Sequence, residues 1–435
     1  MSKKQRYWLG AFIVPTLIVF TFYYAKTSVV LYQLGLKANK YVALNVNKNS
    51  GVRKHLLKYA EHILQYSPRT HNISYQKNDA IVGATPSLVL TPEFGKNSYK
   101  IIKVKNVSQL LRQLNLAKAG DIIWIAPGVY KLIGKRFPVK HSGTSTQKII
   151  LMAETFGSVL LQLDSVEGLY LTQPHWSIHN LIFEGVCRYD NNCEHGIHLI
   201  GNADNTEIIN NRFINFNAHI KSNGRRGDFP DNITIRHNDF YNQSPRKTKN
   251  PVTPIDVVGG NDWLIENNFI ADFALKEQNN FTVSYGAFLK GASQRGKIVG
   301  NVVNCAWNVP HQSFLDIRIG LSLGGGGTAK AFCQDAVCDY EHKDGVIENN
   351  LILNCQNDVS IYLNKAPDSM IKDNILLNSL GIDARFSITT ATIQNNQYQG
   401  RIKARDGSHL IKSNNDNIRI TQELTSIKLR GTNIL

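Results

Sequence analysis

Seven short segments of the chain place a titratable or hydroxyl-bearing side chain among aliphatic residues. The segments are "GIHLI", "AHIKSN", "PIDVVG", "AFLKGA", "DIRIGL", "SIYLN" and "GIDARF", which carry His198, Lys221, Asp256, Lys290, Arg318, Tyr362 and Asp383. Successive side chains of a strand point to opposite faces, so a strand with one buried face directs these residues outward. His219 and Arg385 lie two residues from Lys221 and Asp383 and are expected on the same face. Such a column suits proton transfer to or from a bound ligand, and the alternative is a solvated charge ladder that stabilises the strands.

An asparagine motif repeats through the same region and predicts its fold. A branched apolar residue, two residues, Asn and further apolar residues recur at Asn211, Asn238, Asn268, Asn301, Asn350, Asn374 and Asn396, with spacings of 22 to 49 residues. A motif with such a period indicates a solenoid, and the short β-branched segments favour coils of parallel strands over helices. Asparagine tolerates the left-handed backbone of a corner, and stacked asparagines hydrogen-bond from coil to coil. We therefore predict an all-β protein built as a parallel β-helix, with coils about 4.8 Å apart.

The N-terminal region is expected to form separate elements. Residues 7–25 carry no charge and follow the basic stretch "MSKKQR", which favours an uncleaved membrane anchor in residues 1–28 over a cleaved signal peptide. The body would then lie on the extracytoplasmic side, in the periplasm or outside the cell. Residues 29–98 are interpreted as a partly helical stalk, 99–420 as the β-helix and 421–435 as a C-terminal tail. A short helix with Val107, Leu110, Leu111 and Leu114 on one face is expected to cap the solenoid.

The charge of the chain indicates an anionic partner. The 435 residues carry a net charge of +16, and the hydrophobic content of 42% is ample for a core. The basic residues are spread thinly and no recognition helix or zinc finger is evident, so nucleic acid is not expected as a partner. The Gly324–Gly327 run lacks the ending of a phosphate-binding loop and is interpreted as a turn that lets a polymer approach the backbone.

The six cysteines indicate an oxidising compartment. Two pairs close in sequence are expected to form disulfides, Cys187 with Cys193 and Cys333 with Cys338. A zinc site at Cys333, Cys338 and His342 is the alternative, but a fourth ligand is missing and no metal site is predicted. Cys305 and Cys355 end two similar segments and are interpreted as small buried residues.

Several segments carry a family resemblance. "AGDIIWIAPGVY" resembles the N-terminal signature of right-handed parallel β-helix proteins of the pectate-lyase-like superfamily, and "SGTSTQKIILMAETFGSVLLQ" with "WSIHNLIFEGV" resembles polysaccharide lyase family six, which includes chondroitinase B and alginate lyases. That family carries a lysine and, one coil later, an arginine, which act as base and acid in β-elimination of uronate-containing polysaccharides. "FLKGASQRGKIVGN" and "DIRIGLSLGG" resemble these segments, so the resemblance implies catalytic roles for Lys290 and Arg318. Many members bind calcium through acidic residues just before the lysine, but "NNFTVSYGAFLK" contains none, so no cofactor is expected.

β-Elimination sets demands that these residues can meet. A lysine with an ordinary pKa of about 10.4 is protonated at neutral pH, and an arginine nearby would lower that pKa, whereas Asp256 would raise it. Arg318 suits neutralisation of the substrate carboxylate, with Lys221 and His219 as candidates for the same role. Asp256, His198, Tyr362 and Arg385 are expected to contact the substrate. The alternatives are a glycan-binding protein without catalysis, a uronate epimerase, and a glycoside hydrolase, for which the outward aspartates lie far apart.

Overall fold

The computed structural model describes residues 74–75, 82–86, 88, 99–276, 282–418 and 428–429. Residues 78–311 and 315–419 form one compact unit, and in the other unit β1 (Ser74–Tyr75) pairs in parallel with β37 (Lys428–Leu429). The predicted anchor in residues 1–28 lies outside the described residues, as does nearly all of the predicted stalk and tail. Within the described part of the chain, no helix has both the length and the apolar character needed to cross a membrane.

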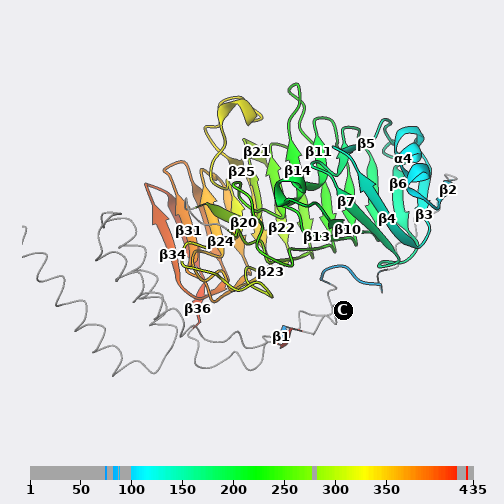
Figure 1. Ribbon diagram of the computed structural model, residues 1–435. Coiled ribbons are helices and arrows are strands. Elements are labelled where there is room, and N and C mark those ends of the chain that lie inside the picture. Colours follow the sequence, from blue (N-terminus) through cyan, green and yellow to red (C-terminus); the bar gives the residue numbers. More distant parts are fainter. Residues whose placement is uncertain are drawn as a thin grey trace, which may run out of the picture. The chain divides into compact units, whose positions relative to one another are not determined.

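The larger unit is a stack of coils in which each complete coil contributes one strand to each of three parallel sheets, while β2 at one end and β35 with β36 at the other belong to incomplete coils (Figure 1). The twelve-stranded sheet contains β2 (Lys100–Val104), β3 (Asp121–Ile125), β6 (Ile149–Ala153), β9 (Trp176–His179), β12 (Glu207–Ile209), β15 (Thr234–Arg236), β18 (Leu264–Glu266), β22 (Lys297–Val299), β26 (Val346–Glu348), β29 (Ser369–Lys372), β32 (Thr390–Gln394) and β35 (His409–Ser413). The eleven-stranded sheet contains β4 (Gly128–Ile133), β7 (Val159–Asp164), β10 (Ile182–Gly185), β13 (Arg212–Ile214), β16 (Asp239–Tyr241), β19 (Phe269–Ala271), β23 (Val302–Asn304), β27 (Leu351–Leu353), β30 (Ile375–Leu377), β33 (Gln397–Tyr398) and β36 (Asp416–Asn417). The ten-stranded sheet contains β5 (Phe137–Pro138), β8 (Leu169–Leu171), β11 (His195–Ile200), β14 (Ala218–Asn223), β17 (Ile255–Val258), β20 (Val283–Lys290), β24 (Ile317–Leu323), β28 (Ile361–Asn364), β31 (Gly381–Arg385) and β34 (Arg401–Arg405). The predicted parallel β-helix is confirmed.

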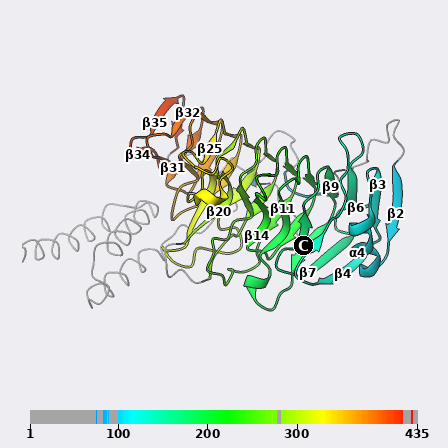
Figure 2. The same ribbon diagram turned by 90° about the horizontal axis from the view of Figure 1, so that it is seen from above.

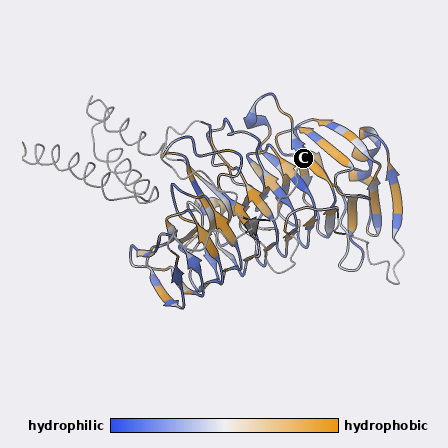
Figure 3. Ribbon diagram, turned by 90° about the horizontal axis from the view of Figure 1, so that it is seen from below, coloured by the Kyte–Doolittle hydropathy of each residue, from blue (hydrophilic) through white to orange (hydrophobic). Residues whose placement is uncertain are grey.

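The core runs through the interior of the stack. The central residue of each three-residue strand in the twelve- and eleven-stranded sheets faces inward. Equivalent residues of successive coils stack, as Phe183, Phe213 and Phe240 do with ring centroids 4.7 and 5.1 Å apart. Apolar and polar residues alternate along the strands, which Figure 3 shows as alternating orange and blue segments. This alternation is the period-two pattern from which the strands were predicted.

A ladder of buried asparagines crosses the stack where the twelve-stranded sheet turns into the eleven-stranded one. The side-chain oxygen of Asn301 accepts hydrogen bonds from the main-chain N–H and the Nδ2 of Asn268, and Asn350 accepts the same two bonds from Asn301. The pattern extends beyond the predicted motif, because Asn415 accepts from Asn396. The coil-to-coil bonding is therefore confirmed. The left-handed residue of this corner is the one before each ladder asparagine, so the prediction that the ladder residue itself is left-handed is wrong.

The predicted helix closes one end of the stack. Helix α4 (Val107–Leu116) begins at Asn106, whose side chain accepts a hydrogen bond from the Gln109 N–H, and it buries Leu110 and Leu114. It packs against β3, β4 and β5, and Figure 2 shows the helix at the end of the stack that carries β2, β3 and β4. The helix therefore covers core residues that would otherwise face water.

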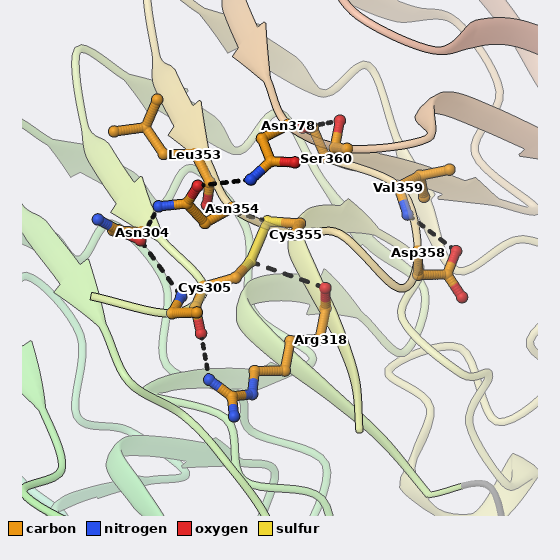
Figure 4. Close-up of a disulfide and its surroundings, with 12 residues drawn as sticks. Asn304, Cys305, Arg318, Leu353, Asn354, Cys355, Asp358, Val359, Ser360 and Asn378 are labelled. Atoms are coloured by element: carbon orange, nitrogen blue, oxygen red, sulfur yellow. Dashed lines mark hydrogen bonds between the residues drawn. A yellow bond between two sulfur atoms is a disulfide. The ribbon is translucent and has the colours of Figure 1, made fainter. Parts of the chain in front are cut away.

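Three disulfides are present among the described residues. The predicted pairs Cys187–Cys193 and Cys333–Cys338 are confirmed. Cys305 and Cys355 form a third disulfide, which joins successive coils, so their interpretation as unpaired buried residues was wrong (Figure 4). The alternative zinc site is excluded because both of its cysteines are oxidised and the His342 ring is hydrogen-bonded to the Ser293 hydroxyl and the Gly296 N–H.

Candidate functional site

The outward side chains of the ten-stranded sheet form one row across successive coils. Cross-strand pairing places His198 beside Lys221 and Lys221 beside Asp256, as predicted. Farther along, Tyr362 lies beside Asp383. The two rungs between Asp256 and Tyr362 are Phe288 and Ser322.

The register of the two expected catalytic residues differs from the prediction. Lys290 pairs with Val258 on one side, and because Leu289 pairs with Leu323, the next coil presents Gly324 opposite Lys290. Arg318 instead pairs with Ser284, near the other end of β20. Ser284 is six residues from Lys290, which in an extended strand corresponds to about 20 Å. The prediction that Arg318 neighbours Lys290 is therefore wrong.

Arg318 is fully buried and points away from the row. Its guanidinium forms a bidentate ion pair with Asp316 and donates hydrogen bonds to the main-chain oxygens of Cys305, Val309 and Pro310. Its sequence neighbour Ile319 lies in the apolar cluster of the outer face, whereas the Arg318 side chain extends toward the Cys305–Cys355 disulfide (Figure 4). With its donors bound to the protein, Arg318 holds a loop in place and presents no group to the outer row.

His219 is also buried, although it was expected to face outward. Its ring packs against Phe216 and Phe240, and Nε2 contacts the main-chain oxygen of Tyr241 at 3.2 Å. Burial lowers the pKa of His219 to about 3, so the ring is neutral at pH 7 and cannot neutralise a carboxylate. The ring contacts with Phe216 and Phe240 place His219 on the inner side, so counting two residues from Lys221 does not give the same face here.

Lys221, Asp256 and Lys290 form the charged centre of the row. The Lys221 ammonium lies 2.7 Å from the Asp256 carboxylate, and both side chains are mostly buried. Burial lowers the pKa of Lys290; Asp256 acts in the opposite direction, and Lys221 lowers the pKa further. These three groups therefore sense one another electrostatically, and Lys290 loses its proton more readily than an exposed lysine.

A glycine turn, residues 324–327, covers Lys290. The Lys290 ammonium donates a hydrogen bond to the main-chain oxygen of Gly327 at 3.1 Å and lies 4.6 Å from the centre of the Phe288 ring. Buried Glu341 fixes the end of the turn by accepting hydrogen bonds from the Thr328 N–H and hydroxyl and from the Gly291 N–H. The turn leads into the segment closed by Cys333–Cys338, which rises from the stack in yellow in Figure 1.

A second group of polar residues lies at the N-terminal half of the row. His198 contacts Asn223 through Nε2 at 3.2 Å and lies 3.6 Å from Glu167 through Nδ1. Glu167 pairs with Arg136, whose guanidinium stacks over the Tyr170 ring. Burial lowers the pKa of His198 to about 4, so a neutral imidazole faces the row at pH 7.

The other predicted contact residues lie at the C-terminal half. Arg385 forms an ion pair with Asp406, and this interaction raises the pKa of Arg385. Asp383 pairs with Arg405 from the next coil. This end of the row is half-exposed, and each of these arginines is paired with an aspartate.

The residues before Lys290 do not fit a calcium site. Val283, Tyr285 and Phe288 pack with Val258 and Ile319 in an apolar cluster on the outer face. Calcium requires several carboxylate or carbonyl oxygens, and this cluster offers no carboxylate. No step through calcium is derived for this chain.

Tyr285, Phe288 and Glu341 were missed by the sequence analysis. The sequence does contain a signal for Tyr285 and Phe288. The segment "YGAFL" at 285–289 repeats the pattern of "HGIHL" at 195–199, in which two aromatic residues are separated by a glycine and one aliphatic residue. In both strands the two rings form an edge-to-face pair. Glu341 lies 51 residues after Lys290 and only the insertion brings it close, so the local sequence holds no signal for it.

Comparison with known proteins supports the family resemblance. The profile of the Chondroitinase B family matches residues 104–261, a part of the chain that contains Lys221 and Asp256 and ends before Lys290. No curated protein sequence matches the chain. The chain is a parallel β-helix protein that resembles polysaccharide lyase family six.

The chain also shows similarity to solved structures at low sequence identity. An alginate lyase from Paenibacillus sp. str. FPU-7 has 17% sequence identity and a TM-score of 0.41, and the alignment covers 73% of this chain and 95% of the lyase. A family-six polysaccharide lyase from Pseudopedobacter saltans has 14% identity and a TM-score of 0.34, with 76% and 96% covered. A family GH136 lacto-N-biosidase from Eubacterium ramulus has 10% identity and a TM-score of 0.48, with 73% and 68% covered.

Proposed function

We propose that this β-helix protein binds a uronate-containing polysaccharide along the outer row of the ten-stranded sheet and cleaves it by β-elimination at Lys290. The Chondroitinase B match and the net charge of +16 support an acidic sugar polymer as the ligand. The observation that carries the proposal is the position of Lys290, which is mostly buried beside Lys221 and Asp256 with a lowered pKa. A group with a perturbed pKa in a row of convergent polar residues is a candidate for catalysis.

In this reaction the neutral Lys290 amine removes the proton from C5 of the uronate. Its lowered pKa increases the fraction of amine at neutral pH relative to an ordinary lysine. The adjacent substrate carboxylate must be neutralised, and Lys221 is the cation that we assign to this role, with Asp256 holding it in place. Arg318 is not assigned a role because its donors are bound to the protein.

Glycan binding without cleavage is the second candidate. Two observations favour it. First, Gly324 stands one coil after Lys290, where the family resemblance implies an arginine. Second, the hydrogen bond from Lys290 to the Gly327 oxygen favours the charged ammonium. A hydrolase that uses Asp256 and Asp383 is disfavoured, because four coil spacings, about 19 Å, exceed the roughly 10 Å that two catalytic carboxylates span.

We further propose an extracytoplasmic location with membrane anchoring through residues 1–28. Three disulfides and no free cysteine occur among the described residues, which suits an oxidising compartment. Cell fractionation with and without protease treatment of intact cells tests this location. Protection of the body inside the cytoplasm would contradict it.

The activity is tested on a polymer panel. The full-length protein is incubated with alginate, chondroitin, hyaluronan and pectate, and unsaturated uronate is followed by its ultraviolet absorbance. The lyase proposal expects absorbance to rise on at least one polymer. Tight binding without unsaturated product on any polymer would favour the binding protein, and exchange of the C5 proton with solvent without cleavage would favour an epimerase.

A further inference from the structure

Tyr285 and Lys290 lie beneath the same glycine turn. A Cβ placed on Gly326 would lie 3.6 Å from the Tyr285 hydroxyl oxygen, and a Cβ placed on Gly325 would lie 3.3 Å from Cδ of Lys290. Both side chains also contact Phe288, since the Tyr285 ring packs edge-on to it and the Lys290 ammonium lies over its face. The phenol and the amine are therefore neighbours beneath this turn.

The Tyr285 hydroxyl has no hydrogen-bond partner among the described residues of the chain, although its ring is buried. The hydroxyl oxygen itself is not among the buried polar atoms that lack a partner, so it keeps contact with solvent and can donate to a ligand that enters beside Lys290. Phe288 fills the same apolar cluster with a ring that carries no hydroxyl, so packing in this cluster does not require the hydroxyl of Tyr285.

We propose that Tyr285 is the acid that protonates the leaving glycosidic oxygen; this inference rests on the proposed function. The Lys290 amine takes the C5 proton, the C5–H electron pair forms the C4–C5 double bond, and the C4–O bond breaks. The oxygen that leaves receives the phenolic proton of Tyr285. Proton transfer from the Lys290 ammonium through solvent then restores the phenol and the amine.

Other groups near Lys290 are less suited to this role. Both oxygens of Glu341 already accept hydrogen bonds from the glycine turn and its neighbours. Burial raises the pKa of Tyr285, so the hydroxyl stays protonated throughout the range in which Lys290 loses its proton. In this reaction the glycine turn must move aside for the substrate to reach both groups, which breaks the hydrogen bond from Lys290 to the Gly327 oxygen.

The experiment compares two leaving groups in wild type, Tyr285→Phe and Lys290→Ala. The first substrate is the polymer that the panel identifies, and the second is a 4-deoxy-4-fluoro uronide, whose fluoride departs without a proton. Tyr130→Phe is the matched control, because it removes a buried tyrosine hydroxyl that donates to Ala126 at the capped end of the stack. Thermal unfolding establishes that each variant is folded.

The proposal expects Tyr285→Phe to lose at least about 100-fold in kcat on the polymer with KM within about twofold, and to retain wild-type turnover of the fluoride. Lys290→Ala should lose both activities, and Tyr130→Phe neither. Equal loss of both activities in Tyr285→Phe, or full retention of polymer cleavage, would overturn the role of Tyr285 as the acid. The assignment of Lys290 as the base would still stand. Absence of unsaturated product from wild type on both substrates would overturn the proposed function together with this inference.

Discussion

Replacing Asp256 by asparagine should shift the pH dependence of the reaction to lower pH. If Lys290 is the base, kcat/KM rises as the pH increases through the pKa of Lys290. The negative charge of Asp256 raises that pKa. Asp256 pairs with Phe288, two residues from Lys290, which gives a separation of about 8 Å from the strand spacing and rise. At an effective dielectric constant of about 20, the attraction is about 2 kcal/mol, and at about 40 it is half that. We therefore expect a downward shift of about one pH unit.

The shift is measured as the midpoint of the acidic limb of kcat/KM, which does not depend on the absolute activity of the variant. The unpaired Lys221 ammonium acts in the same direction, since it also lowers the pKa of Lys290. Asp262→Asn removes an exposed carboxylate paired with Arg295 outside the row and serves as the control without a shift. A midpoint that stays in place or moves upward in Asp256→Asn would refute the electrostatic coupling that we infer.

Three further predictions concern stability. Asn301→Ala should lower the free energy of unfolding by about 3–5 kcal/mol in urea denaturation, because it leaves two donors of Asn268 unpaired; a loss below about 1 kcal/mol would contradict the ladder's importance. Replacing Cys305 and Cys355 by serine should cost about 4 kcal/mol, more than removal of either short disulfide, because this bridge spans 50 residues; the reverse order would contradict the loop-closure argument. The folded-state pKa of His342 is about 3, below the unfolded value of about 6.5, so this histidine stabilises the fold above pH 6.5 and the contribution is lost as pH falls. Wild type should therefore lose about 2 kcal/mol more than His342→Gln between pH 7 and pH 5, and equal losses would contradict the assignment.

The fold was predictable because each coil repeats the same physical demands. Inward residues such as Phe213 and Phe240 must stack, and the ladder asparagines must satisfy buried main-chain groups, so both leave a period in the sequence. The helix was predictable for the same reason, since Leu110 and Leu114 share the face that covers the open end of the core.

The register of the outer row was predicted only in part. The strands were aligned on their polar residues, whereas an alignment on their glycines gives the observed register. Gly286 and Gly320 occupy equivalent positions, at which a Cβ on Gly286 would lie 2.5 Å from the main-chain oxygen of Gly320. Aligning "YGAFL" with "IGLSL" on these glycines places Ser322 beside Phe288 and Gly324 beside Lys290. Arg318, four residues before Ser322, then falls at the other end of the strand.

The remaining differences arise from contacts between distant parts of the chain. The partners of Arg318 come from its own coil's loop near Cys305, and the main-chain oxygens that it binds leave no pattern in the sequence. The glycine turn over Lys290 belongs to an insertion whose path depends on Glu341. Local periodicity carries no information on such contacts, although they decide which groups reach the substrate.

The most direct test of the account is the kcat of Lys290→Ala for formation of unsaturated uronate. Lys297→Ala, which removes an exposed lysine from β22 of the twelve-stranded sheet, is the matched control. The account predicts that Lys290→Ala loses at least about 100-fold in kcat with KM within about threefold, while Lys297→Ala retains wild-type activity. Full activity in a folded Lys290→Ala protein would contradict the assignment of Lys290 as the base.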